Sequence, residues 1–245
     1  MRLHLLLVPL LLRAAPAAAQ DVVRPGSAQV AGDSIPERMD EFEMYDLEDD
    51  AEPFGEMRLR TRFTTIGGVE AIARREMVLV DGDLVQADSF ALERRTLAPL
   101  HVRIGGQEQT VWLDFGPGGV RKTIEGDWGV DTIHVALDAP VFYAATMDLL
   151  LGALPLAEGY TAQVALYEWV EDRRQTVRIR VEEAETLRLP GGGRARTWRV
   201  NVPEGGSAGT YWMDRESRTL VQYESTDGVR IVRSRAARSR ARPTR

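Results

Sequence analysis

The chain has 245 residues, of which 44% are hydrophobic and 28% charged, with 22 glycines and 12 prolines. This composition is typical of a globular protein with a substantial core, and it excludes a wholly disordered chain. The length allows one large β domain or two small domains. The chain contains no cysteine, which excludes disulfides, thiolate metal sites, thiol catalysis and lipidation on cysteine.

Basic charge is concentrated at the end of the chain. The net charge is −6, but residues 230–245 contain seven arginines and no acid. The preceding residues therefore carry 24 basic against 37 acidic side chains, a net charge of −13. Because the folded part is acidic, we expect no nucleic-acid partner.

The first nineteen residues have the features of a secretory signal peptide. Arg2 precedes an apolar run at residues 5–12, and Ala17 and Ala19 fit the small-residue cleavage rule. A membrane span needs about 17 to 25 apolar residues, more than this run provides. We therefore predict a signal peptide at residues 1–19 and a periplasmic or secreted mature protein.

Residues 20–53 show no sustained period and become acidic. Residues 37–56 contain ten acidic side chains and one arginine, which predicts a disordered, solvated leader. A calcium loop is the alternative interpretation, but residues 46–50 lack the alternating oxygen ligands and the turn glycine of an EF-hand.

From Met57 onward the sequence alternates with period two. Met57, Leu59 and Phe63 alternate with arginines and threonine, and similar alternation surrounds Val177 and Trp198. Such runs predict half-buried strands. Short glycine-rich turns favour antiparallel neighbours; they lie at residues 67–68, 81–83, 105–106, 116–119, 126–129, 190–193, 205–206 and 227–228. We predict about ten strands at residues 54–233.

Residues 140–156 break this rhythm. Met147, Leu150, Leu151 and Leu154 have helical spacing, which predicts one short helix. A curved sheet with one apolar face needs a cover, and the helix can supply it. The expected fold is therefore mainly β: an antiparallel curved sheet or incomplete β-barrel with one short helix. Residues 234–245 are predicted to form a disordered, arginine-rich tail.

No catalytic residue, cofactor or metal site follows from the sequence. The zincin, nucleophile-elbow and P-loop motifs are absent. His101 and His134 are expected on the polar faces of strands, and Trp112 also lies on the polar side, where it is a candidate for lining a second surface. Four aspartates lie on or beside predicted strands and are explained as exposed acids: Asp88, Asp114, Asp131 and Asp138.

Three segments resemble a domain of unknown function that is common in exported bacterial proteins: residues 89–100, residues 154–156 followed by Gly159, and residues 209–214 with 218–221. That domain is similar in outline to the lipoprotein-carrier superfamily, whose fold is an incomplete antiparallel β-barrel around helical cover. The resemblance spans residues 54–232. It implies that an apolar concave face holds a ligand, as carriers hold acyl chains. No site residue of that superfamily maps onto this chain.

The leading hypothesis is an exported, non-enzymatic envelope protein that binds an apolar or lipid-like ligand, or a partner, in the concave face. The expected wall residues are Leu59, Phe63, Val177, Ile179, Trp198 and Val200, although packing of a core without ligand explains the same residues. Two alternatives remain open. One is an interaction module whose arginine-rich tail docks on an anionic envelope surface. The other is a hydrolase that uses carboxylates or His134.

Overall fold

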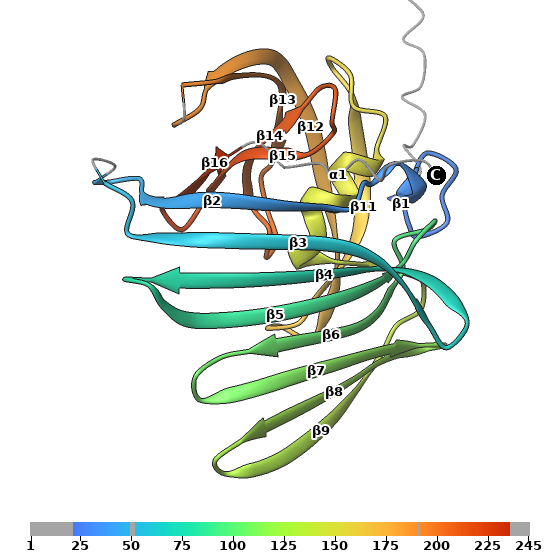
Figure 1. The fold of residues 1–245 in the computed structure, drawn as a ribbon. Coiled ribbons are helices and arrows are strands. Elements are labelled where there is room, and N and C mark those ends of the chain that lie inside the picture. The colour runs from blue at the N-terminus through green and yellow to red at the C-terminus, as the bar shows by residue number, and fades with distance from the viewer. Residues whose placement is uncertain (1–21, 50–51, 191, 236–245) are drawn as a thin grey trace, which may run out of the picture.

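The computed structural model describes residues 22–49, 52–190 and 192–235. The predicted signal peptide and most of the predicted tail lie outside these residues. The described residues form sixteen strands, one α-helix and two 3₁₀ helices (Figure 1).

The first half of the chain forms consecutive hairpins. Its elements are β1 (Val22–Val23), the 3₁₀ helix η1 (Gly32–Ser34), β2 (Arg38–Asp46), β3 (Gly55–Ile66), β4 (Val69–Val80), β5 (Asp83–Glu93), β6 (Pro99–Gly105), β7 (Gln109–Gly116), β8 (Gly119–Gly126) and β9 (Gly129–Ala136). Tight turns join several pairs. Gly67 and Gly68, and likewise Asp81 and Gly82, have positive φ, which matches the twist of antiparallel hairpins.

The second half contains the helix and the remaining strands. Its elements are β10 (Phe142–Tyr143), the 3₁₀ helix η2 (Ala144–Thr146), α1 (Met147–Ala153), β11 (Thr161–Glu168), β12 (Arg173–Arg188), β13 (Arg194–Val202), β14 (Gly209–Asp214), β15 (Leu220–Ser225) and β16 (Val229–Arg235). All strands join one sheet in the order β1-β11-β12-β13-β14-β15-β16-β2-β3-β4-β5-β6-β7-β8-β9, with β10 paired to β11. The sheet is not closed, since β9 and β1 are its two ends.

The sheet curls until one part of it covers another, and β11 lies between the two parts. On one side of β11, Val164 and Leu166 pack in the main core with α1. On the other side, Ala165 and Tyr167 pack in a second core with inward residues of β5–β8, such as Leu113. Both faces of β11 are therefore buried, and the opposite face of β3–β8 forms an outer surface.

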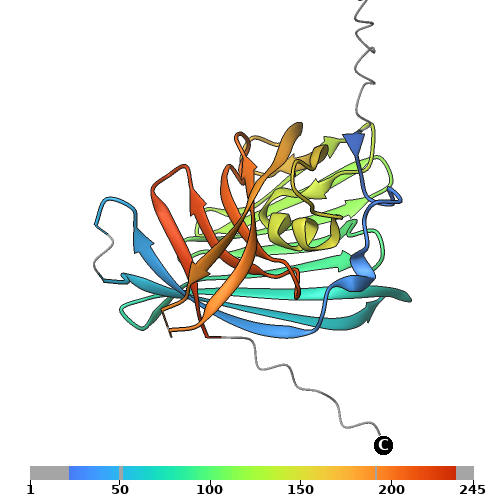
Figure 2. The same cartoon turned by 90° about the horizontal axis from the view of Figure 1, so that it is seen from above.

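Helix α1 lies inside the curve of the sheet (Figures 1 and 2), and all seven of its residues are buried. A Cβ at Gly152 would lie 2.6 Å from the carbonyl oxygen of Arg218, so glycine permits a close approach to the β14–β15 connection. Asp148 anchors the first turn: Nη2 of Arg74 donates to its Oδ2 at 3.0 Å. The cover predicted for the concave face is thus present and is part of the core.

The predicted fold class is confirmed, but the predicted strand number is wrong, because sixteen strands replace about ten. The prediction of a disordered leader is also wrong for β2, which pairs with β3 and β16. Strand β2 directs Arg38 and Asp40 into the protein, where Nε of Arg38 donates to Oδ2 of Asp40 at 2.5 Å. This inward ion pair removes the apolar alternation by which the strand could be recognised.

Within the described ranges, no helix has both the length and the hydropathy needed to cross a membrane.

Candidate functional site

The six predicted wall residues point into the main core. Leu59, Val177, Ile179 and Val200 are fully buried there, in the same cluster as the leucines of α1. Phe63 and Trp198 are half-buried at its edge. None of the six lines either of the two surface hollows described below. Binding of an apolar ligand at this face stays a prediction.

The outer surface of β3–β7 carries a different set of side chains. Thr61, Arg74 and Phe90 face inward and are buried, so their neighbours along each strand face outward. Register pairs Arg60 with Arg75, and it continues across β5 to β7. The outward side chains belong to Arg60, Arg62, Ala73, Arg75, Ser89, Ala91, His101, Arg103, Trp112 and Asp114.

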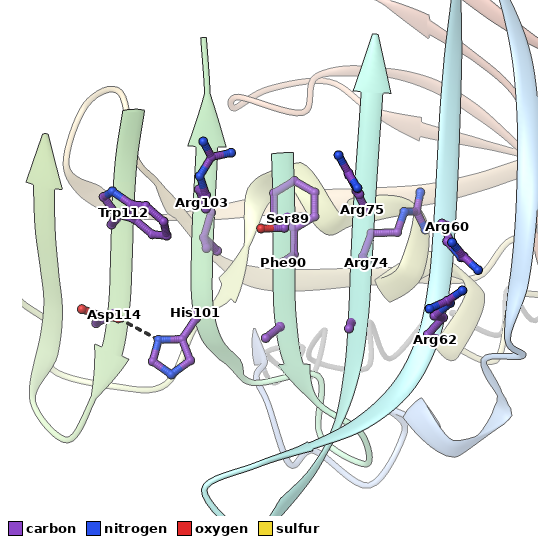
Figure 3. Close-up of a pocket in the computed structure, with 13 residues that line it drawn as sticks. Arg60, Arg62, Arg74, Arg75, Ser89, Phe90, His101, Arg103, Trp112 and Asp114 are labelled. Carbon is purple, nitrogen blue, oxygen red and sulfur yellow. Dashed lines mark hydrogen bonds and ion pairs between the residues drawn. The ribbon is translucent and has the colours of Figure 1, made fainter. Parts of the chain in front are cut away.

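These ten residues line a hollow of about 560 Å³, with Arg74, Phe90 and Val102 beneath them. We call it the outer trough. Its floor is low because Ala73, Ala91 and Ser89 have small side chains. Figure 3 shows Arg60, Arg62 and Arg75 on one side of Ser89, and Arg103, His101 and Trp112 on the other.

Four arginines give the outer trough its charge. Among the described residues, no carboxylate lies within 4.0 Å of the guanidinium of Arg60, Arg62 or Arg75. Arg103 is held at the opposite wall, where its Nη1 donates to the Ala87 carbonyl at 3.2 Å and its Cζ lies 5.3 Å from the Trp112 ring centroid. Such contacts fix the guanidinium plane while they leave donors for an anion.

One end of the trough carries a compensated acid, Asp114. Nη2 of Arg121 donates to its Oδ2 at 2.5 Å, and Nδ1 of His101 lies 2.7 Å from its Oδ1 (Figure 3). The hydrogen bond from Arg121 holds the pKa of Asp114 below its usual value. This carboxylate is therefore ionised and already has its partners, and it is the one acid among the ten residues of the trough.

A buried charged network lies directly behind the trough. Arg74 contacts Asp148 and Glu76, and Nη2 of Arg38 lies 3.7 Å from Asp148. Burial raises the pKa of Glu76 to about 8 and also raises the pKa of Asp88, its cross-strand neighbour. Perturbed carboxyl groups are candidates for chemistry, but neither residue lines either hollow.

The histidines and aspartates that are candidates for catalysis are spread over four different strands of the sheet and the segment after β9. His134 and Asp131 lie on the exposed edge strand β9, and Asp138 pairs with Arg174. Ser89, His101 and Asp114 share the trough, but in the described structure no hydrogen bond joins Ser89 to His101.

A second hollow of about 480 Å³ lies where the β7–β8 turn meets the segment before β10. It is mainly apolar, and its lining includes Pro99, Phe115, Pro117, Leu137 and Pro140. Its one charged residue, Asp138, is the ion-pair partner of Arg174. This hollow therefore has no unpaired charged side chain that could bind a charged ligand.

Sequence reasoning placed Arg60, Arg62, His101 and Trp112 on polar faces, and the structure confirms this. It did not select them as a site. The alternation in β3 predicted that its arginines face outward. Only the strand register shows that they lie on the same surface as Arg103 of β6.

Fold and site together define a protein with an open, curled, mainly antiparallel β-sheet and an arginine-rich trough on its outer face. The chain belongs to the family described as "Protein of unknown function (DUF3108)", whose model matches residues 53–233. The matched region begins after β2, although β2 is part of the same sheet.

A search of solved structures finds a similar protein from Brucella abortus, described as a beta-barrel-like protein of domain of unknown function DUF1849. The two chains share 10% identity with a TM-score of 0.46, over 83% of this chain and 97% of the other. No curated protein matches the chain.

Proposed function

We propose that this protein is an exported, non-enzymatic binding protein that holds an anionic ligand in the outer trough. The observation that carries this proposal is the set of four arginines around a floor of small residues, three of them without a carboxylate partner among the described residues. The chain as a whole has a net charge of −6, so this positively charged surface differs in sign from the protein's overall charge.

The chemistry of the trough favours an anion with several acceptor oxygens. Guanidinium groups remain charged at any physiological pH and donate two parallel hydrogen bonds to carboxylate or phosphate. Arg60 and Arg75 are cross-strand partners, so both can reach one anionic group. Like charges placed opposite one another destabilise a sheet, and a bound anion would relieve that repulsion.

Binding of inorganic tripolyphosphate, measured by isothermal titration calorimetry at low salt, tests this proposal. The variant Arg60→Glu/Arg62→Glu should weaken binding about tenfold or more, since charge-assisted contacts are lost and repulsion is added. Arg178→Glu/Arg180→Glu is the matched control, because these arginines are also exposed and two residues apart on a strand. Equal affinity in both variants, or no binding by the natural protein, would refute the proposal.

An apolar ligand in the concave face would have to share the core with α1. Lipid extraction of the purified protein, followed by mass spectrometry, tests it directly, and recovery of a stoichiometric lipid would favour this site over the trough. Docking through the arginine-rich tail is tested by removing residues 236–245, which leaves β16 intact, and by measuring binding to anionic vesicles at low salt.

A further inference from the structure

Strand β9 forms one end of the sheet, and no described strand pairs with the edge that faces away from β8 (Figure 1). Seven of its eight residues are exposed, and Val135 is half-buried. The strand pairs with β8 without a bulge, and it contains no proline or lysine. Apart from the single charge of Asp131, β9 therefore lacks the features that keep an edge strand from pairing with another chain.

The free edge of β9 offers backbone donors and acceptors at alternate residues. The N–H of Leu137 donates to the carbonyl of Gly118 at 3.0 Å, and the register of β8 with β9 has no shift. Opposed residues of an antiparallel ladder exchange hydrogen bonds at every second position, so the odd-numbered residues of β9 bond to β8. Val130, Thr132 and His134 therefore direct their N–H and C=O groups away from β8. An added strand has donors and acceptors at the same spacing.

An exposed tryptophan precedes β9 in the β8–β9 turn. Trp128 is 67% exposed, and a Cβ at Gly126 would lie 2.7 Å from its Cη2. The ring therefore lies over Gly126, on the side of β8 on which Val120 and Lys122 are buried. This inner side of the hairpin thus presents a large apolar group at the beginning of β9.

The second hollow lies at the other end of β9. Leu137 follows the last residue of the strand and lines the hollow together with Gly119, the cross-strand partner of Ala136. Phe115 also lines it, and both Phe115 and Leu137 pack against the second core, so the hollow opens on the inner side as well. An exposed apolar ring and a mainly apolar hollow therefore lie on the same side of the sheet, at opposite ends of one strand.

We infer that two copies of this chain pair antiparallel through β9 and form a symmetric dimer. Antiparallel pairing exchanges the ends of the strand, so Trp128 of each copy packs into the second hollow of the other. A two-fold axis at Thr132 places Trp128 opposite residue 136 of the other copy, and an axis at Ile133 places it opposite residue 138. An axis at Asp131 would oppose two carboxylates, which destabilises a sheet.

This dimer does not depend on anion binding. The outer trough is formed by β3–β7, whereas the interface is formed by β9 and the hollow on the inner side. The symmetric arrangement explains two features with one contact, because each copy supplies both the ring and the hollow. A strand from another protein would pair with the backbone of β9, but nothing in the edge itself would then account for Trp128.

Sedimentation velocity of the purified protein between about 1 and 100 µM tests the inference and should show a monomer–dimer equilibrium. Thr132→Pro removes an outward N–H at a position where an edge strand tolerates proline, so it should weaken dimerisation about tenfold or more. Thr132→Val keeps the N–H and the branched side chain, and it should dimerise like the natural protein. Circular dichroism checks that each variant is folded.

The tryptophan is tested separately, with a variant that leaves the strand unchanged. Trp128→Ser should weaken dimerisation about tenfold, because the apolar ring no longer fills the hollow. Trp112→Ser is the matched control, since Trp112 is also exposed but lies in the outer trough. This pair of variants keeps the inference testable even if Thr132→Pro does not fold.

Cysteine substitution adds a readout of the pairing itself, because the chain contains no cysteine. Thr132→Cys and Ile133→Cys each place two thiols close together across the axis, so air oxidation of at least one of these variants should yield a disulfide-linked dimer. Thr123→Cys is the control: Thr123 pairs with Thr132 from β8, one strand away from the interface, and should not crosslink.

Two results would overturn the inference. A protein that stays monomeric over the whole concentration range has no such dimer, and the edge of β9 would then be open to a strand of another protein. A dimer that persists in Thr132→Pro and Trp128→Ser, or that crosslinks at neither position, has its interface elsewhere. Neither result affects anion binding by the outer trough, which the tripolyphosphate titrations test independently.

Discussion

The buried ion pair between Arg74 and Asp148 should contribute strongly to stability, and Arg74→Met tests its contribution. Arg74 is 2% exposed; its Nη2 lies 3.0 Å from Asp148, and its Nη1 lies 3.5 Å from Oγ1 of Thr61. Removing one partner of a buried pair costs about 3–5 kcal/mol, because the other charge stays buried. Arg38 remains 3.7 Å from Asp148, so we expect about 3 kcal/mol, at the lower end of that range.

Equilibrium unfolding in urea measures this loss. A double variant, Arg74→Met/Asp148→Leu, removes both charges and should recover much of the lost free energy, because apolar replacement of a buried pair is often close to neutral. Arg178→Met, an exposed control, should stay within about 0.5 kcal/mol of the natural protein. A loss below about 1 kcal/mol for Arg74→Met would refute the view that this pair anchors α1.

Three further predictions rest on the structure, and a fourth rests on the sequence. Burial raises the pKa of Glu76 from 4.5 to about 8, so the folded state binds this proton more tightly than the unfolded state does. The free energy of unfolding should therefore fall as pH rises from 4.5 to about 8. Urea unfolding at several pH values measures this fall, and Glu76→Gln should make the dependence of stability on pH less steep. Gly152→Ala should cost about 1–3 kcal/mol in thermal or urea unfolding, because its Cβ would clash with a backbone oxygen. Ligand binding at the trough should weaken as salt rises, whereas an apolar ligand would show the opposite trend in calorimetry. The predicted signal peptide implies that Gln20 is the first residue found by amino-terminal sequencing of the mature protein, and retention of residues 1–19 would contradict cleavage.

Strands in which apolar and polar residues alternate regularly could be predicted from the sequence. Strands with buried charges, or with both faces buried, could not. In β3, inward Leu59 and outward Arg60 follow the period of a half-buried strand. In β2 the inward positions hold Arg38 and Asp40, so charge conceals the period. In β11 nearly every residue is buried, since cores lie on both of its faces, and alternation is absent where neither face meets water.

The candidate site was only partly accessible from the sequence, because it depends on the order of strands in space. Alternation placed Trp112 and His101 on the polar sides of their strands. It could not show that Ala73 and Ala91 form a low floor between two groups of arginines, which requires the register of β3 to β6. The alternation and helical spacing did predict that a short helix covers the concave face, and α1 lies there with all seven residues buried.

Backbone amide chemical shifts, recorded by NMR during titration with tripolyphosphate, test the central claim most directly. The account predicts saturable shifts around Arg60, Arg75 and Arg103, with Arg178 and Arg180 unchanged. Shifts confined to residues 236–245, or spread evenly over all exposed arginines, would contradict it.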